Sequence, residues 1–176
     1  MTLRAALALS LLPVVAFAAG SSDSTPPTKT ETTEVCTDGM VWDEVKEECA
    51  APSDARLDDK TLYDAAREFA YAGQLDDSRG ALEAMQVKSD GYLTYMGFIS
   101  RKSGDLDGAE AFYQAALALN PNNLGARSYM GQGYVAAGKS YKARAELTEI
   151  RTRGGRGSWA EISLRMAIEN GSGFSY

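Results

Sequence analysis

The 176-residue sequence contains no histidine. This absence excludes Ser-His-Asp and Cys-His catalysis, and it removes imidazole as a metal ligand. Asp76 and Asp77 are adjacent carboxylates, but nothing in the sequence holds two carboxylates across a cleft with separated pKa values, as a glycosidase requires. The sequence therefore predicts a protein that is not an enzyme and that uses no cofactor.

Cysteine is nearly absent as well. Only Cys36 and Cys49 are present, within the stretch CTDGMVWDEVKEEC. In an oxidising compartment two thiols this close predict a disulfide, whose closure of a short loop contributes roughly 3 kcal/mol to stability. Zinc requires four ligands, and a cysteine pair without histidine does not supply them, so we predict no metal site.

The same stretch has a C…DG…WD…C pattern. In this pattern it faintly resembles small extracellular cysteine-framed modules, which carry more cysteines than this chain. Some of those modules bind polysaccharide. The resemblance implies an alternative function, in which the loop from Cys36 to Cys49 binds cell-wall glycan with the help of Trp42.

Long apolar runs are missing except at the N-terminus. The chain begins MTLRAALALSLLPVVAFAAG, with one arginine, an apolar stretch, and the small residues Ala16 and Ala18 where a signal peptidase reads them. A membrane-spanning helix needs about 20 apolar residues, and Pro13 interrupts a run that is already shorter. We expect residues 1–18 to be a cleaved signal peptide, with an uncleaved anchor as the alternative. The mature protein is then periplasmic or secreted, without stable membrane insertion.

Basic residues are outnumbered, with 18 Lys and Arg against 24 Asp and Glu. An acidic balance disfavours a general nucleic-acid binder, because phosphates attract basic surfaces. The charge is uneven: ten acidic residues lie between Glu31 and Asp59, whereas eight basic residues lie between Arg127 and Arg165. The two ends could attract each other or different partners.

Apolar residues are also missing from Ser21 to Thr33, which is rich in Ser, Thr and Pro. Such a segment cannot bury enough surface to offset the entropy of ordering, so we predict a flexible linker over residues 19–35. The polar stretch APSDARLDD predicts a second linker over residues 50–58.

An internal repeat occupies the rest of the chain. Gly73, Gly104 and Gly138 each follow a helical pattern and precede a second one, at spacings of 31 and 34 residues. Aligning the chain on these glycines places small residues together where two helices must cross closely, and large apolar residues beside them. The small residues are Ala66, Gly97 and Gly131.

The middle unit, from Asp90 to Asn123, resembles the tetratricopeptide repeat family. Its residues Leu93, Met96, Gly97, Gly104, Leu106, Ala109, Tyr113, Ala116, Asn120 and Pro121 occupy the places of the family signature. The resemblance extends over about Asp59 to Gly157. It implies an all-α fold, a right-handed superhelix of about three helix pairs within residues 59–170.

A final helix is expected from about Trp159 to Asn170. Ser158 and Glu161 form a capping-box pattern, and Asn170-Gly171 is a stop signal. Trp159, Ile162 and Met166 make one apolar stripe, which we expect to cover the exposed end of the repeat stack. Residues 171–176 are then a short tail.

In the resembled family, ligands contact mainly the first helix of each repeat, on the concave side. Carried over position by position, this implies a groove of aromatic and basic residues. These are Tyr63, Arg67, Tyr71, Thr94, Tyr95, Phe98, Arg101, Lys102, Ser128, Tyr129 and Gln132. Such a surface suits an extended acidic or aromatic-containing peptide. Two alternatives stay open: the tyrosines are packing residues, or the acidic segment before Asp59 lies in the groove itself.

Together these patterns predict a noncatalytic adaptor of the bacterial periplasm. Its partner is expected to be a peptide segment of a protein in the cell envelope, bound in the concave groove. Glycan binding through the cysteine loop is the alternative function.

Overall fold

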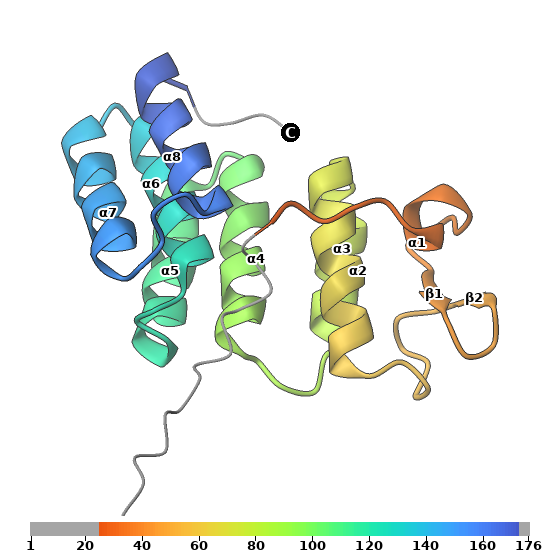
Figure 1. The fold of residues 1–176 in the computed structure, drawn as a ribbon. Helices are drawn as coiled ribbons and strands as arrows, with labels where there is room; N and C mark the ends of the chain where they lie inside the picture. The colour runs from red at the N-terminus through yellow and green to blue at the C-terminus, as the bar shows by residue number, and fades with distance from the viewer. Residues whose placement is uncertain (1–24, 173–176) are drawn as a thin grey trace, which may run out of the picture.

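The computed structural model describes residues 25–172 of the chain (Figure 1). The predicted signal peptide and the last four residues of the predicted tail lie outside this part. The described elements are α1 (Glu31–Glu34), β1 (Val41–Asp43), β2 (Glu48–Ala50), α2 (Asp59–Ala72), α3 (Leu75–Ala84), α4 (Asp90–Lys102), α5 (Leu106–Leu119), α6 (Leu124–Ala136), α7 (Ser140–Thr152) and α8 (Trp159–Asn170).

The helices from α2 to α8 form three successive antiparallel pairs and a final single helix (Figure 1). Within each pair the two helices pack closely: α2 with α3, α4 with α5, and α6 with α7. The first helices of the pairs also contact one another in sequence order, α2 with α4 and α4 with α6. We call α2, α4 and α6 the inner helices. The predicted helical-repeat fold is confirmed.

The glycines that end the inner helices repeat the same backbone geometry. Gly73, Gly104 and Gly138 have φ values of 81°, 90° and 72°, in the left-handed region that L side chains rarely adopt. Side-chain caps mark the starts of α2, α4, α5 and α6. Asp58, Ser89, Asp105 and Asn123 each accept a hydrogen bond from a backbone N–H in the first turn of the helix that follows. The turns therefore come from local signals.

The small residues at the predicted crossings allow close packing. A Cβ atom placed on Gly97 would lie 2.7 Å from the ring of Tyr113, which is buried on α5. A Cβ atom on Gly131 would lie 2.7 Å from the side chain of Leu164 on α8. In the first pair, Ser78 Oγ instead donates a hydrogen bond to the carbonyl of Ala66 at 2.7 Å. At the same repeat position, therefore, α2 packs closely on α3, α4 on α5, and α6 on α8.

The helix α8 covers the end of the stack with a face that differs from the predicted stripe. Its buried residues include Ala160, Ser163, Leu164 and Ala167, whereas Trp159, Ile162 and Met166 are only half-buried. The rotation follows from the fit of Leu164 against Gly131 on α6. Ser158 Oγ caps the helix as predicted, accepting from the N–H of Glu161, but the Glu161 carboxylate pairs with Arg151.

The cysteine loop forms a small unit before the repeats. Cys36 and Cys49 are joined by a disulfide, which confirms the predicted bond. The strands β1 and β2 pair antiparallel, with Val41 opposite Ala50 and Trp42 opposite Cys49. Val41 and Ala50 are buried against the helical domain. The loop is therefore attached to the first repeat.

Residues 25–35 differ from the predicted flexible linker, because they have a polar anchor that hydropathy does not reveal. Thr30 is the N-cap of α1 and Thr33 lies within this helix, and their backbone N–H groups and hydroxyls all donate to the buried carboxylate of Glu68 on α2. Arg67 Nη2 donates to the carbonyl of Thr25 at 3.0 Å. This segment, drawn in orange-red, crosses in front of α2 in Figure 1. We call residues 25–35 the N-terminal strap.

Candidate partner-binding site

The predicted groove residues all lie on the inner helices. Tyr63, Arg67 and Tyr71 are on α2; Thr94, Tyr95, Phe98, Arg101 and Lys102 are on α4; Ser128, Tyr129 and Gln132 are on α6. Within each helix most of them recur three or four residues apart, and residues at that spacing share one helical face. The structure joins some of them into one cluster and places the others elsewhere.

Five rings from three helices form an aromatic cluster. Tyr63 meets Tyr95 edge-on at 5.7 Å between ring centroids, and Tyr71 stacks on Phe98 at 5.8 Å. Phe98 meets Tyr129 edge-on at 5.1 Å. These distances and angles are those that the ring quadrupoles favour. The aromatic cluster, defined as Tyr63, Tyr71, Tyr95, Phe98 and Tyr129, therefore holds the inner helices of all three repeats together.

Hydroxyl groups connect the same cluster. The Tyr71 and Tyr129 hydroxyls lie 2.7 Å apart, and the Tyr95 hydroxyl lies 3.5 Å from that of Tyr129. Arg67 Nε donates to the Tyr95 hydroxyl at 3.2 Å. A cation from α2 thus completes a network that joins the hydroxyls of Tyr71, Tyr95 and Tyr129 and reaches α6.

Most of the predicted groove is buried. Tyr95, Phe98 and Gln132 have 0% of their surface exposed, whereas Tyr63 and Tyr71 are half-buried and Lys102 is exposed. The close approach of α2 to α4 contributes, since a Cβ atom on Gly91 would lie 2.8 Å from the Tyr63 ring. The packing role that the sequence analysis left open for the tyrosines therefore describes their state in this structure.

Thr94 and Ser128 are not part of the aromatic cluster. Thr94 Oγ1 donates to the carbonyl of Asp90 at 2.7 Å and accepts from Asn123 Nδ2 at 3.0 Å. The Ser128 hydroxyl lies 3.0 Å from that of Ser163 on α8. These buried residues join neighbouring helices. Asn123 was not predicted as part of any network, although it follows the Asn-Pro signature that closes the middle repeat.

Two cations flank the ring of Phe98 on α4. The Arg101 guanidinium carbon lies 5.2 Å from the ring centroid, and Lys102 Nζ lies 5.8 Å from it. Partial desolvation of its ammonium group lowers the pKa of Lys102, and the charge of Arg101 lowers it further. The basic character predicted for this face is therefore present, next to the aromatic cluster.

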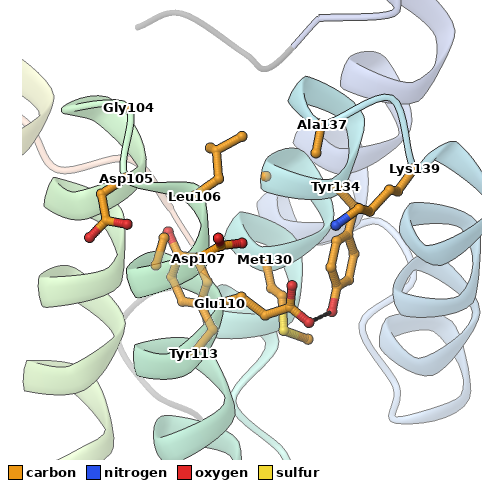
Figure 2. Close-up of a pocket in the computed structure, with 12 residues that line it drawn as sticks. Gly104, Asp105, Leu106, Asp107, Glu110, Tyr113, Met130, Tyr134, Ala137 and Lys139 are labelled. Carbon is orange, nitrogen blue, oxygen red and sulfur yellow. Dashed lines mark hydrogen bonds between the residues drawn. The ribbon is translucent and has the colours of Figure 1, made fainter.

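A separate pocket of about 330 Å³ lies between α5 and α6, where the turns after α4 and α6 meet (Figure 2). Sequence reasoning did not identify it. On one wall the Tyr134 hydroxyl donates to Glu110 Oε1 at 2.8 Å, and Lys142 Nζ lies 3.7 Å from the same oxygen. Burial and the Glu110 carboxylate raise the pKa of the Tyr134 phenol. The Glu110 carboxylate is thus satisfied by a phenol and an ammonium group.

The cysteine loop places Trp42 at its junction with α2. The side chain is half-buried and lines a pocket of about 200 Å³ together with Lys60, Asp64 and Glu68 of that helix. Within residues 25–172, no three Cys, Asp or Glu side chains are grouped so that they could hold a metal ion. No helix in the described part of the chain combines the length and the apolar character needed to cross a membrane.

The stacked pairs and the cluster across their inner helices define the class of the protein, an α-helical repeat protein. A tetratricopeptide repeat family model matches residues 100–156, from the end of α4 to the loop after α7. Over this part the chain is similar to tetratricopeptide repeats, which generally mediate protein–protein interaction. Comparison with curated proteins and with solved structures found no significant match.

Proposed function

We propose that this protein is a noncatalytic adaptor of the cell envelope that binds a peptide segment of another protein on its inner-helix face. The observation that carries the proposal is the aromatic cluster with its adjoining cations, Arg67, Arg101 and Lys102. The half-buried rings Tyr63 and Tyr71 offer contact area at small entropic cost, and the exposed Lys102 offers a positive charge to a carboxylate.

The mechanism is preorganisation. The rings contact one another across α2, α4 and α6, and the hydroxyl network fixes their orientation. Because the protein side is already ordered, binding loses mainly the conformational entropy of the peptide. Tyr71 and Lys102 retain exposed surface at the border of the cluster, so they are the residues that we expect a peptide to contact first.

The N-terminal pattern and the disulfide support the proposed location. Residues 1–18 have the features of an export signal, and disulfides persist in oxidising compartments such as the periplasm. We therefore propose that the partner is itself an envelope protein.

Affinity capture from an envelope extract tests this function. The baits are the wild-type protein, Lys102→Glu at the cluster, and Lys46→Glu on the exposed cysteine loop as a charge-matched control. We expect the wild type and Lys46→Glu to retain the same partner, and Lys102→Glu to lose most of it because a like charge repels an acidic peptide. Thermal unfolding of all three should be similar. If Lys102→Glu retains the partner fully, the inner-helix face is not the binding surface.

A further inference from the structure

The N-terminal strap crosses α2 next to the aromatic cluster (Figure 1). Arg67 on α2 donates through Nε to the Tyr95 hydroxyl of the cluster and through Nη2 to the carbonyl of Thr25 in the strap. With the strap in place, Arg67 is 7% exposed. A cavity of about 320 Å³ remains between the strap and α2. The strap therefore covers the first repeat beside the rings that we propose as the partner surface.

The strap makes the contacts of a bound peptide. Glu68 accepts from the backbone N–H and the hydroxyl of Thr30, both at 2.7 Å, and from the same two groups of Thr33. Arg67 binds the Thr25 carbonyl, and two prolines follow Thr25 in the sequence. Proline restricts the backbone, so ordering such a segment costs little entropy. This part of α2 thus recognises an extended segment that is rich in hydroxyl groups.

Polar contacts hold the strap, and it can leave without exposing an apolar core. Residues 25–34 contain only Thr, Pro, Lys and Glu, and Val35 is already 58% exposed. The Thr32 hydroxyl accepts from the backbone N–H of Trp42 at 3.2 Å. Segments with few buried apolar contacts open at a low cost in free energy. The strap continues into Cys36, whose disulfide keeps an opened strap attached to the first repeat.

We infer that the N-terminal strap is a tethered competitor of the partner peptide. It occupies the α2 part of the inner-helix face, and a partner binds across α2 only after the strap has left Arg67 and Glu68. The inference rests on the proposed function and adds its regulation. A partner that displaces the strap offers the same chemistry, a carbonyl for Arg67 and hydroxyl or N–H donors for Glu68.

The first test measures opening of the strap by limited trypsin cleavage after Lys29. The double variant Thr30→Val with Thr33→Val removes two hydroxyl donors, and the opened strap returns Glu68 to water. Each rate is compared with that of the matching free peptide. The wild type should be cleaved at least tenfold more slowly than its peptide, and the double variant within about twofold of its own. Thr28→Val, a control in the strap outside these contacts, should stay slow.

Glu68→Gln changes the α2 side of the same contact at nearly constant volume, and it should open the strap as well. Far-UV circular dichroism of both variants should match the wild type. If the strap stays protected in both, these contacts do not hold it and the inference is wrong. A loss of helical signal in both would show that the strap is a structural element, which also overturns the inference.

The second test adds a labelled peptide of residues 25–35, blocked at both ends, and measures fluorescence anisotropy. The double variant should bind it at least tenfold more tightly than the wild type, in which the tethered strap holds the site at a high effective concentration. Glu68→Gln is open but has lost the carboxylate, so it should not bind. Equal binding to the double variant and to Glu68→Gln would show that the peptide uses another surface.

The third test repeats the capture from envelope extract with the double variant as bait. It should retain several times more partner than the wild type, and excess peptide 25–35 should release this partner. The same peptide with valine at both threonine positions should not. If both baits retain the partner equally and the peptide releases none, the proposed function survives and the competition is overturned. If no bait retains a protein, the proposed function fails and the competition fails with it.

Discussion

At the scale of single residues, the glycines on the helices divide into two kinds. Gly97 lies where α4 meets Tyr113, and its hydrogen atom is the only substituent that the ring of Tyr113 leaves room for. Gly80 lies on the exposed side of α3, and a Cβ atom there would meet nothing within 4 Å. The same substitution at the two positions should therefore have opposite effects.

We predict that Gly97→Ala lowers the free energy of unfolding by about 1–3 kcal/mol, because overpacking outweighs the gain in helix propensity. Gly80→Ala should raise it by about 0.5–1 kcal/mol, since the propensity gain acts alone. Urea unfolding followed by circular dichroism measures both. Equal effects of the two variants would contradict the close approach of α4 and α5.

The aromatic and basic positions were predicted from the resemblance to tetratricopeptide repeats, applied in the register of the repeats. Tyr95 and Tyr129 align between repeats, and Tyr63 aligns with Thr94, one residue before Tyr95, so the register places the three tyrosines near one face. Their burial was not predictable, because it depends on how closely successive inner helices approach. That spacing is set by residues such as Gly91, which sit on the opposing helix and carry no sequence signal of the contact.

At the scale of elements, the attachment of α8 depends on an ion pair. Glu161 accepts from Arg151 Nη2 at 2.6 Å and from Nε at 3.1 Å, which ties the start of α8 to the end of α7. The hydrogen bonds from Arg151 lower the pKa of Glu161 below its usual value, with a smaller contribution from Arg165. The carboxylate form is therefore favoured in the folded protein.

This pKa shift predicts a pH dependence. Because the pKa of Glu161 is lower in the folded than in the unfolded state, its stabilisation is present above the unfolded value and is lost as the pH falls through the folded value. We expect backbone hydrogen exchange in α8 to accelerate, relative to α4 and α5, as the pH falls below about 4. Glu161→Gln should lack this additional acceleration. An unchanged pH profile in the variant would show that another group controls α8.

The ends of the helices were the features that the sequence predicted best. Capping side chains and left-handed glycines determine a helix end through contacts within a single turn. The N-terminal strap was not predicted. The strap is anchored by the carboxylate of Glu68, which lies 38 positions after Thr30 in the sequence. The composition of the strap itself gives no sign of this contact.

At the scale of the whole molecule, the cysteine loop and the repeats share a limited contact. The disulfide closes a loop of 13 residues, and such a constraint contributes roughly 3 kcal/mol. In repeat proteins stability is approximately a sum of local units and nearest-neighbour interfaces. Loss of the disulfide should therefore act mainly on the N-terminal part.

We predict that Cys36→Ser with Cys49→Ser leaves the helical content of α4 to α8 intact but removes hydrogen-exchange protection from β1, β2 and the N-terminal strap. Mass spectrometry of exchanged peptides measures this directly. The wild type in the presence of a reductant should behave in the same way. Loss of protection throughout the chain would instead show that the loop and the repeats unfold as one unit.

The anchoring of the N-terminal strap on Glu68 also has a consequence for the order of folding. Thr30 and Thr33 come before Glu68 in the chain, so their four hydrogen bonds to this carboxylate cannot form until α2 has formed. The N-terminal strap therefore reaches its native position only after α2 has folded. During this interval Cys36 is held near Cys49 only by the connecting chain, and α2 serves as the template on which the earlier segment is finally ordered.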